Sequence, residues 1–71
     1  MPKALELRKV IKILGKYGIV YVTGKGRHPK FFDLHTKKSY PVKAHGNKTM
    51  ILPYALNDII DKFDLPGDIF D

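Results

Sequence analysis

The chain has 71 residues, a formal net charge of +6 and no cysteine. Such a length can bury one hydrophobic core, so the sequence predicts a single domain over residues 1–71. The lack of cysteine excludes a disulfide scaffold and a thiolate metal site and favours a reducing compartment, which we expect to be the cytoplasm. The apolar runs are far shorter than the ~20 residues of a membrane span, and no signal-peptide core precedes the first charges, so neither insertion nor export is expected.

The first predicted element is an amphipathic helix from Ala4 to Tyr17. Basic residues occupy its outer faces, and Gly18 follows at a point where a left-handed residue commonly ends a helix. The apolar face, at helical spacing, consists of Leu7, Val10, Ile11, Leu14 and Tyr17.

Three strands are predicted next, over Ile19–Thr23, Lys30–Leu34 and Ser39–Ala44, because these runs are rich in β-branched and aromatic residues or alternate in polarity. A loop with two glycines and a proline separates the first two strands. Pro41 cannot donate a ladder hydrogen bond, so the third strand is expected to lie at an edge of the sheet or to use its free side there.

The second strand leaves one question open. Side chains alternate between the two faces of a strand, so His28, Lys30 and Phe32 share a face if the strand is regular, and Phe31 takes the other. Either phenylalanine can then be the core residue. A bulge near Pro29 would decide between them and would set the direction of His28.

A second helix is predicted from Pro53 to about Phe63, since proline suits a first helical turn. An acidic tail, 64–71, follows it. The element order predicts an α+β fold with a helix, a three-stranded antiparallel sheet and a helix, both helices covering one face of the sheet. The buried stripe of the second helix is expected to be Leu56, Ile59, Ile60 and Phe63.

The charge is divided unevenly along the chain. Residues 1–57 hold twelve of the thirteen Lys and Arg and two acids, leaving +10, whereas residues 58–71 hold one lysine and five aspartates, leaving −4. A body at +10 favours a polyanionic partner, and nucleic acid is the expected class. Solubility is the alternative explanation for surface lysines.

The histidines His28, His35 and His45 carry the candidate chemistry. Their spacings and the lysines around them do not suit a metal, so no metal or other cofactor is expected. RNA supplies its own nucleophile in the 2′-hydroxyl, and an enzyme that cleaves it needs proton transfer and charge stabilisation at phosphorus. Histidine titrates near neutrality and suits the first task. His28, among Lys25, Arg27 and Lys30 and beside glycines that admit a phosphate, is the candidate.

The chain resembles the HicA toxin family over nearly its whole length. The resemblance is carried by Gly18, by Lys25-Gly26-x-His28, by Pro41-Val42-x-x-His45-Gly46-Asn47-Lys48, and by Leu52-Pro53 ahead of Leu56-x-x-Ile59-Ile60. It implies a messenger-RNA interferase with a fold like that of the double-stranded RNA-binding domain, neutralised by a HicB-like antitoxin.

The resemblance also assigns the active residue, which is the histidine of a Gly-Ser-His motif and corresponds to His28. Arg27 stands in place of the family's serine, and Pro29 stands where a second histidine is common. His45 matches a loop histidine of the family, and a local backbone contact is its alternative role. The second helix is more acidic than in the family, so RNA is expected on the side of the first helix and the sheet loops.

The full prediction is a metal-independent endoribonuclease toxin with His28 as its catalytic residue. A non-catalytic RNA-binding module of the same fold is the alternative, and a third role is protein interaction with an acidic antitoxin that covers His28. The acidic tail is expected to be able to cover His28 within the same chain, in place of the antitoxin. The expected RNA contacts are Lys25, Gly26, Arg27, Lys30, Arg8, Lys12, His45 and Lys48.

Overall fold

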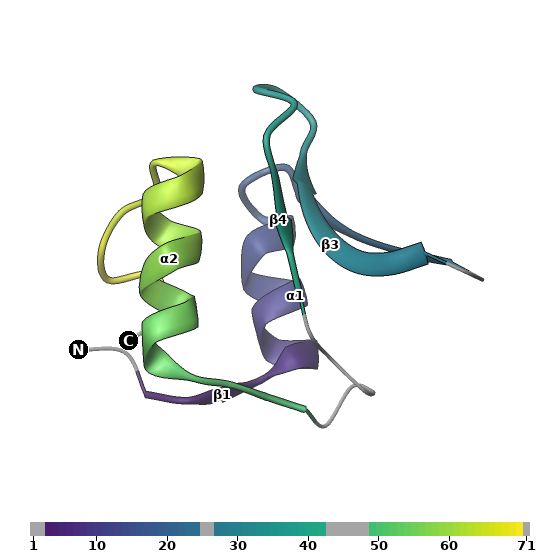
Figure 1. The fold of residues 1–71 in the computed structure, drawn as a ribbon. Coiled ribbons are helices and arrows are strands. Elements are labelled where there is room, and N and C mark those ends of the chain that lie inside the picture. Colours follow the sequence, from purple (N-terminus) through teal and green to yellow (C-terminus); the bar gives the residue numbers. More distant parts are fainter. Residues whose placement is uncertain (1–2, 25–26, 43–48, 71) are drawn as a thin grey trace.

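The computed structural model describes residues 3–24, 27–42 and 49–70 (Figure 1). Two helices and a three-stranded antiparallel sheet form a small α+β fold, to which a second, two-stranded sheet is added. In chain order the elements are β1 (Leu5–Glu6), α1 (Leu7–Gly15), β2 (Ile19–Gly24), β3 (Arg27–Asp33), β4 (Ser39–Pro41), β5 (Met50–Ile51) and α2 (Pro53–Phe63).

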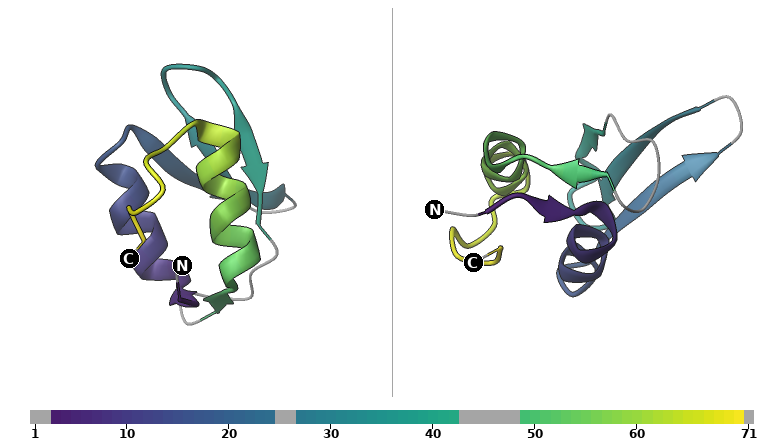
Figure 2. Two further views of the ribbon diagram at one scale, coloured as in Figure 1. Left: turned by 90° about the vertical axis from the view of Figure 1, so that its left-hand side faces the viewer. Right: turned by 90° about the horizontal axis from the view of Figure 1, so that it is seen from below.

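The small sheet was not expected from the sequence, and it shortens the first helix. Leu5 pairs with Ile51 and Glu6 with Met50, so that β1 and β5 run side by side at the starts of the two helices (Figures 1 and 2). The Leu7 N–H donates to the Thr49 carbonyl at 2.8 Å. This bond satisfies a free amide at the helix N-terminus that a capping side chain would otherwise take. The expected start at Ala4 is therefore wrong by three positions.

The first helix also ends before Tyr17, at Gly15. Tyr17 is 43% exposed rather than part of the buried face. The chain turns over Lys16 and Tyr17, and Gly18 adopts φ +76° at the entrance to β2. The left-handed glycine predicted at this point is thus confirmed, although it closes a turn after the helix instead of capping its last residue. The second helix has the predicted bounds, and the residue that follows it, Asp64, is itself left-handed.

The buried side chains of both helices and of the sheet belong to one hydrophobic core. Phe31 of β3 is fully buried in it, and its ring lies 5.3 Å from that of Tyr21. Ile60, expected in the buried stripe of α2, packs only partly against the core. The core residues are Leu7, Val10, Leu14, Ile19, Phe31, Val42, Ile51, Leu56, Ile59, Phe63 and Phe70.

The large sheet has the order β2-β3-β4, which leaves β4 at an edge as Pro41 predicted. The Val42 N–H, beyond the last residue of β4, donates to the Pro29 carbonyl at 2.9 Å. Successive residues of a strand direct their backbone groups to opposite sides, so Pro41, which has no N–H, lies on the free side. The strand expected to reach Ala44 ends at Pro41, and residues 43 and 44 lie outside the described part of the chain.

Candidate functional site

His28 lies on strand β3, not in a loop. The strand begins at Arg27, three residues earlier than expected, and His28 is exposed near the end of the β2–β3 hairpin. Within the described residues, no hydrogen bond or ion pair involves its side chain. An exposed imidazole of this kind is accessible to a large substrate.

A β-bulge beside His28 answers the question of the two phenylalanines. Val22 pairs with Lys30, but Gly24 pairs with Arg27, so β3 has one extra residue in this interval. Beyond the bulge the register is regular, Phe31 points into the core and Phe32 lies on the other face. The expectation that His28 shares the face of Lys30 and Phe32 depended on unbroken alternation. The bulge interrupts that alternation, so parity no longer places His28 there.

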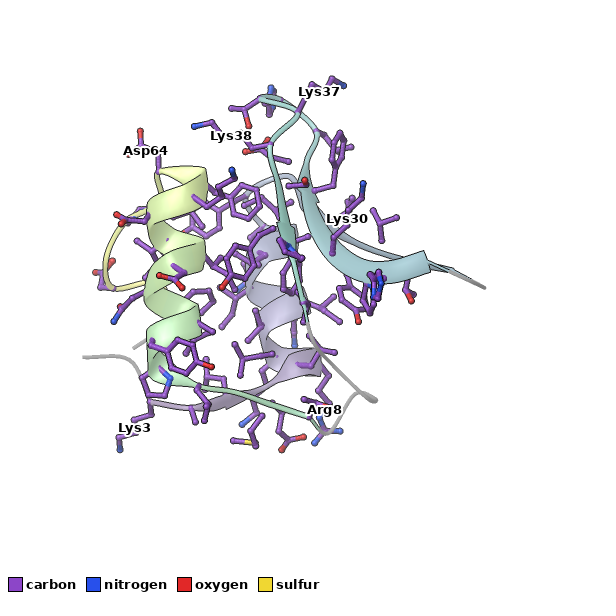
Figure 3. All side chains as sticks on the ribbon, in the orientation of Figure 1. Lys3, Arg8, Lys30, Lys37, Lys38 and Asp64 are labelled. Atoms are coloured by element: carbon purple, nitrogen blue, oxygen red, sulfur yellow. The ribbon has the colours of Figure 1, made fainter. Side chains whose placement is uncertain are left out.

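Lys30 shares the Phe32 ring with Lys37, a cation that the sequence analysis did not assign to the site. The Lys30 ammonium lies 5.8 Å from the centroid of the Phe32 ring, and the Lys37 ammonium lies 5.9 Å from it. Both lysines are exposed and Phe32 is partly buried. Lys37 escaped prediction because it belongs to the β3–β4 turn (Figure 3), and only the folded hairpin brings its ammonium near the Phe32 ring.

The β3–β4 turn holds Lys37 in position through Asp33. The buried Asp33 carboxylate accepts hydrogen bonds from the backbone N–H groups of His35 at 2.8 Å and Thr36 at 3.2 Å. Chiefly the bond from His35 lowers the pKa of Asp33 below its ordinary value of 3.8. Lys37 itself adopts φ 64°, and its N–H donates to the Asp33 carbonyl. A single acid thus orders the turn that carries the second cation.

The helix cations are separate from this group. Arg8 and Lys12 are both exposed on α1, one helical turn apart on the same side. The Arg8 guanidinium pairs with the Glu6 carboxylate at 3.1 Å, which partly neutralises it. Figure 3 places Arg8 at the end of the domain where β1 meets α1, away from Lys37. Among the predicted contacts that the structure describes, the helix cations therefore do not cluster with Lys30.

Four of the predicted contacts lie outside the described residues: Lys25, Gly26, His45 and Lys48. For Arg27, the structure describes the backbone within β3 and not the side chain. The residues of the site whose side chains can be compared are therefore His28, Lys30, Arg8 and Lys12.

A hollow of about 440 Å³ lies between β4, β5 and the start of α2, away from His28. Its walls are mostly apolar, and at one side the Tyr40 hydroxyl donates to the Asp58 carboxylate at 3.4 Å. Burial, followed by the nearby Asp58 charge, raises the pKa of Tyr40. An apolar hollow beside a carboxylate does not suit a phosphate backbone. The residues that line this hollow are Tyr40, Pro41, Val42, Met50, Ile51, Leu52, Tyr54, Ala55 and Ile59.

The comparisons with known proteins return no match: no family model fits the chain, and no curated protein or solved structure is similar to it. Within residues 3–24, 27–42 and 49–70, no three metal-binding side chains lie together. No helix in the same part of the chain is long and apolar enough to cross a membrane.

Proposed function

We propose that this protein is a metal-independent endoribonuclease, a toxin of the HicA type, that cleaves messenger RNA in the cytoplasm with His28 transferring protons. The observation that carries the proposal is an exposed imidazole on a basic hairpin, with Lys30 two residues away on the same strand. The order of helix, three strands and helix supports a fold like the double-stranded RNA-binding domain. Both helices also contribute buried residues to the core that contains Phe31, and this favours both helices on one face of the sheet.

The chemistry needs little more than this surface supplies. His28 as the base removes the proton of the 2′-hydroxyl, whose oxygen attacks the adjacent phosphorus and displaces the 5′-oxygen of the next nucleotide. The cations neutralise charge that develops on the phosphate oxygens. Protonated His28, or water, then returns a proton to the leaving oxygen. Arg27, in the position of the family's serine, would contribute charge instead of a hydroxyl.

The decisive experiment compares His28→Ala with His35→Ala, which removes another exposed imidazole from the β3–β4 turn. RNA cleavage is followed on a denaturing gel in the presence of a chelator, and growth inhibition is scored in cells. Loss of acid–base catalysis is worth about 10² to 10⁴ in rate, so only His28→Ala should be inactive, with an unchanged thermal melt. Cleavage and toxicity that persist in His28→Ala would refute the assignment.

A non-catalytic RNA-binding module is the second candidate. It is favoured by the finding that no described side chain orients the His28 imidazole, whereas acid–base residues commonly have such a partner. It predicts RNA binding that weakens steeply with salt, while the RNA stays intact after long incubation with the wild-type protein.

The proposed protein partner is a HicB-like antitoxin that covers His28. The basic hairpin would attract an acidic partner and speed its association. Addition of the antitoxin should abolish cleavage, and the association rate should fall as salt is raised.

A further inference from the structure

The Phe32 ring has an unusual environment on the solvent side of the sheet. It is partly exposed, and two ammonium groups, those of Lys30 and Lys37, lie within 6 Å of its centroid. Each ammonium is attracted to the ring face, but the two positive charges repel each other. An anion bound near both ammonium groups would offset this repulsion.

Within the described residues, strands β2, β3 and β4 carry no exposed carboxylate beside Phe32. Val20 and Ser39 are the cross-strand partners of Phe32 and share its face. Val22 and Pro41 are the corresponding partners of Lys30. The one carboxylate of these three strands within the described residues, Asp33, is buried and bonded to the turn. Small uncharged side chains therefore leave the ring accessible.

The acidic residues lie elsewhere. Among the described residues that follow β4 in the chain, the aspartates belong to α2 and to the segment after it. Figure 3 shows Asp64 at the end of α2, across the molecule from Lys30. The sheet side is consequently the one that attracts a polyanion, and the α2 side repels it.

We propose that this face binds a single-stranded segment of RNA, in which one base stacks on Phe32 and the Lys30 and Lys37 ammonium groups turn from the ring to the neighbouring phosphates. The inference rests on RNA being the ligand, as proposed above. Base stacking on an aromatic ring combined with cations along the backbone is the usual mode of single-strand binding. An RNA duplex keeps its bases stacked inside the helix and cannot offer one to a flat sheet surface.

This site is distinct from the proton-transferring residue. Phe32 lies beyond the bulge from His28 and takes no part in proton transfer, whereas Lys30 serves both sites as a phosphate-binding cation. Phe32 is a binding residue that should change affinity and KM, whereas His28 should change the rate of cleavage.

The test measures fluorescence anisotropy of a short labelled oligouridylate and of a labelled RNA duplex, using Phe32→Leu and Phe32→Tyr. Leucine keeps an apolar side chain without a ring, and tyrosine keeps the ring. Phe32→Leu should weaken single-strand binding about tenfold, while Phe32→Tyr stays near the wild type. Lys37→Gln should reduce the salt dependence of binding, whereas Lys62→Gln, the same charge change on α2, should not.

Thermal melts first establish that each variant is folded. If Phe32→Leu is not folded, the binding measurement is made on Phe32→Tyr. Loss of single-strand affinity in Phe32→Leu alone, with duplex binding unchanged, supports the proposal. Equal single-strand affinity of Phe32→Leu and the wild type overturns it. Competition by polyglutamate as effective, charge for charge, as that by oligouridylate also overturns it, in favour of an acidic protein segment.

The outcomes also separate this proposal from the proposed function. If the wild type cleaves RNA through His28 but Phe32→Leu binds and cleaves normally, only the stacking site is refuted. If the wild type binds neither the oligouridylate nor the duplex, the proposed function and the stacking site are both refuted.

Discussion

Replacement of Phe31 by leucine tests the face assignment of β3, on which the exposed position of Phe32 depends. Phe31 is 0% exposed, and its ring packs at 54° to that of Tyr21. The change removes about three buried carbons at roughly 0.8 kcal/mol each and the aromatic pair, together about 3 to 4 kcal/mol. A domain of this size has a free energy of unfolding of about 4 to 10 kcal/mol, so the variant loses a large part of its stability.

Phe32→Leu is the matched control, since it makes the same chemical change one residue along the strand. Phe32 is only partly buried, so its replacement should cost less than about 1 kcal/mol. Thermal unfolding followed by circular dichroism reads both. Because 1 kcal/mol shifts the Tm of a small domain by about 4 to 8 °C, Phe31→Leu should lower it by about 12 to 30 °C and Phe32→Leu by a few degrees. A larger loss in Phe32→Leu than in Phe31→Leu would show that the register is reversed and that Phe32 is the core residue.

Three further predictions concern single backbone or charge features. Gly18→Ala should destabilise by about 1 to 2 kcal/mol in urea unfolding, because φ is +76° there although His35 leaves room for a Cβ at 3.7 Å; an unchanged midpoint would contradict the strain. Asp64→Gly should stabilise by about 1 kcal/mol, since it relieves a left-handed aspartate at a helix C-terminus, where the negative charge is also unfavourable; a lower Tm would argue against this. The depressed pKa of Asp33 contributes stability above its ordinary value of 3.8 that is lost as pH falls through the folded pKa. Asp33→Asn should therefore be less stable than the wild type at neutral pH, with the gap closing below about pH 4 in melts across pH; a gap independent of pH would exclude the charge as its cause.

The sequence predicted the features that depend on local patterns. The bounds of α2, the edge position of β4 and the left-handed Gly18 follow from proline chemistry, apolar spacing and glycine, and all three are found in the structure. The pairing of β1 with β5 could not be foreseen, because two-residue strands have no periodicity of their own. The choice between Phe31 and Phe32 depended on a bulge that no residue type announces.

The candidate site was predictable in residue types but not in grouping. His28 stood out by its basic neighbours, and it is exposed as a site residue must be. Its expected place in a loop was wrong, because β3 extends back to Arg27. The pairing of Phe32 with Lys37 depends on a turn that reverses the chain, and sequence spacing gives no measure of that proximity.

The pairing of β1 with β5 has a consequence for the order of folding. It joins Leu5 to Ile51, so the segment between them must close as a loop before these bonds can form. The β2–β3 and β3–β4 hairpins close over short distances and are expected to form earlier. The Leu7 amide, bonded to Thr49, should accordingly exchange its hydrogen faster than the amides of the β2–β3 ladder, and its protection would report on the last step of assembly.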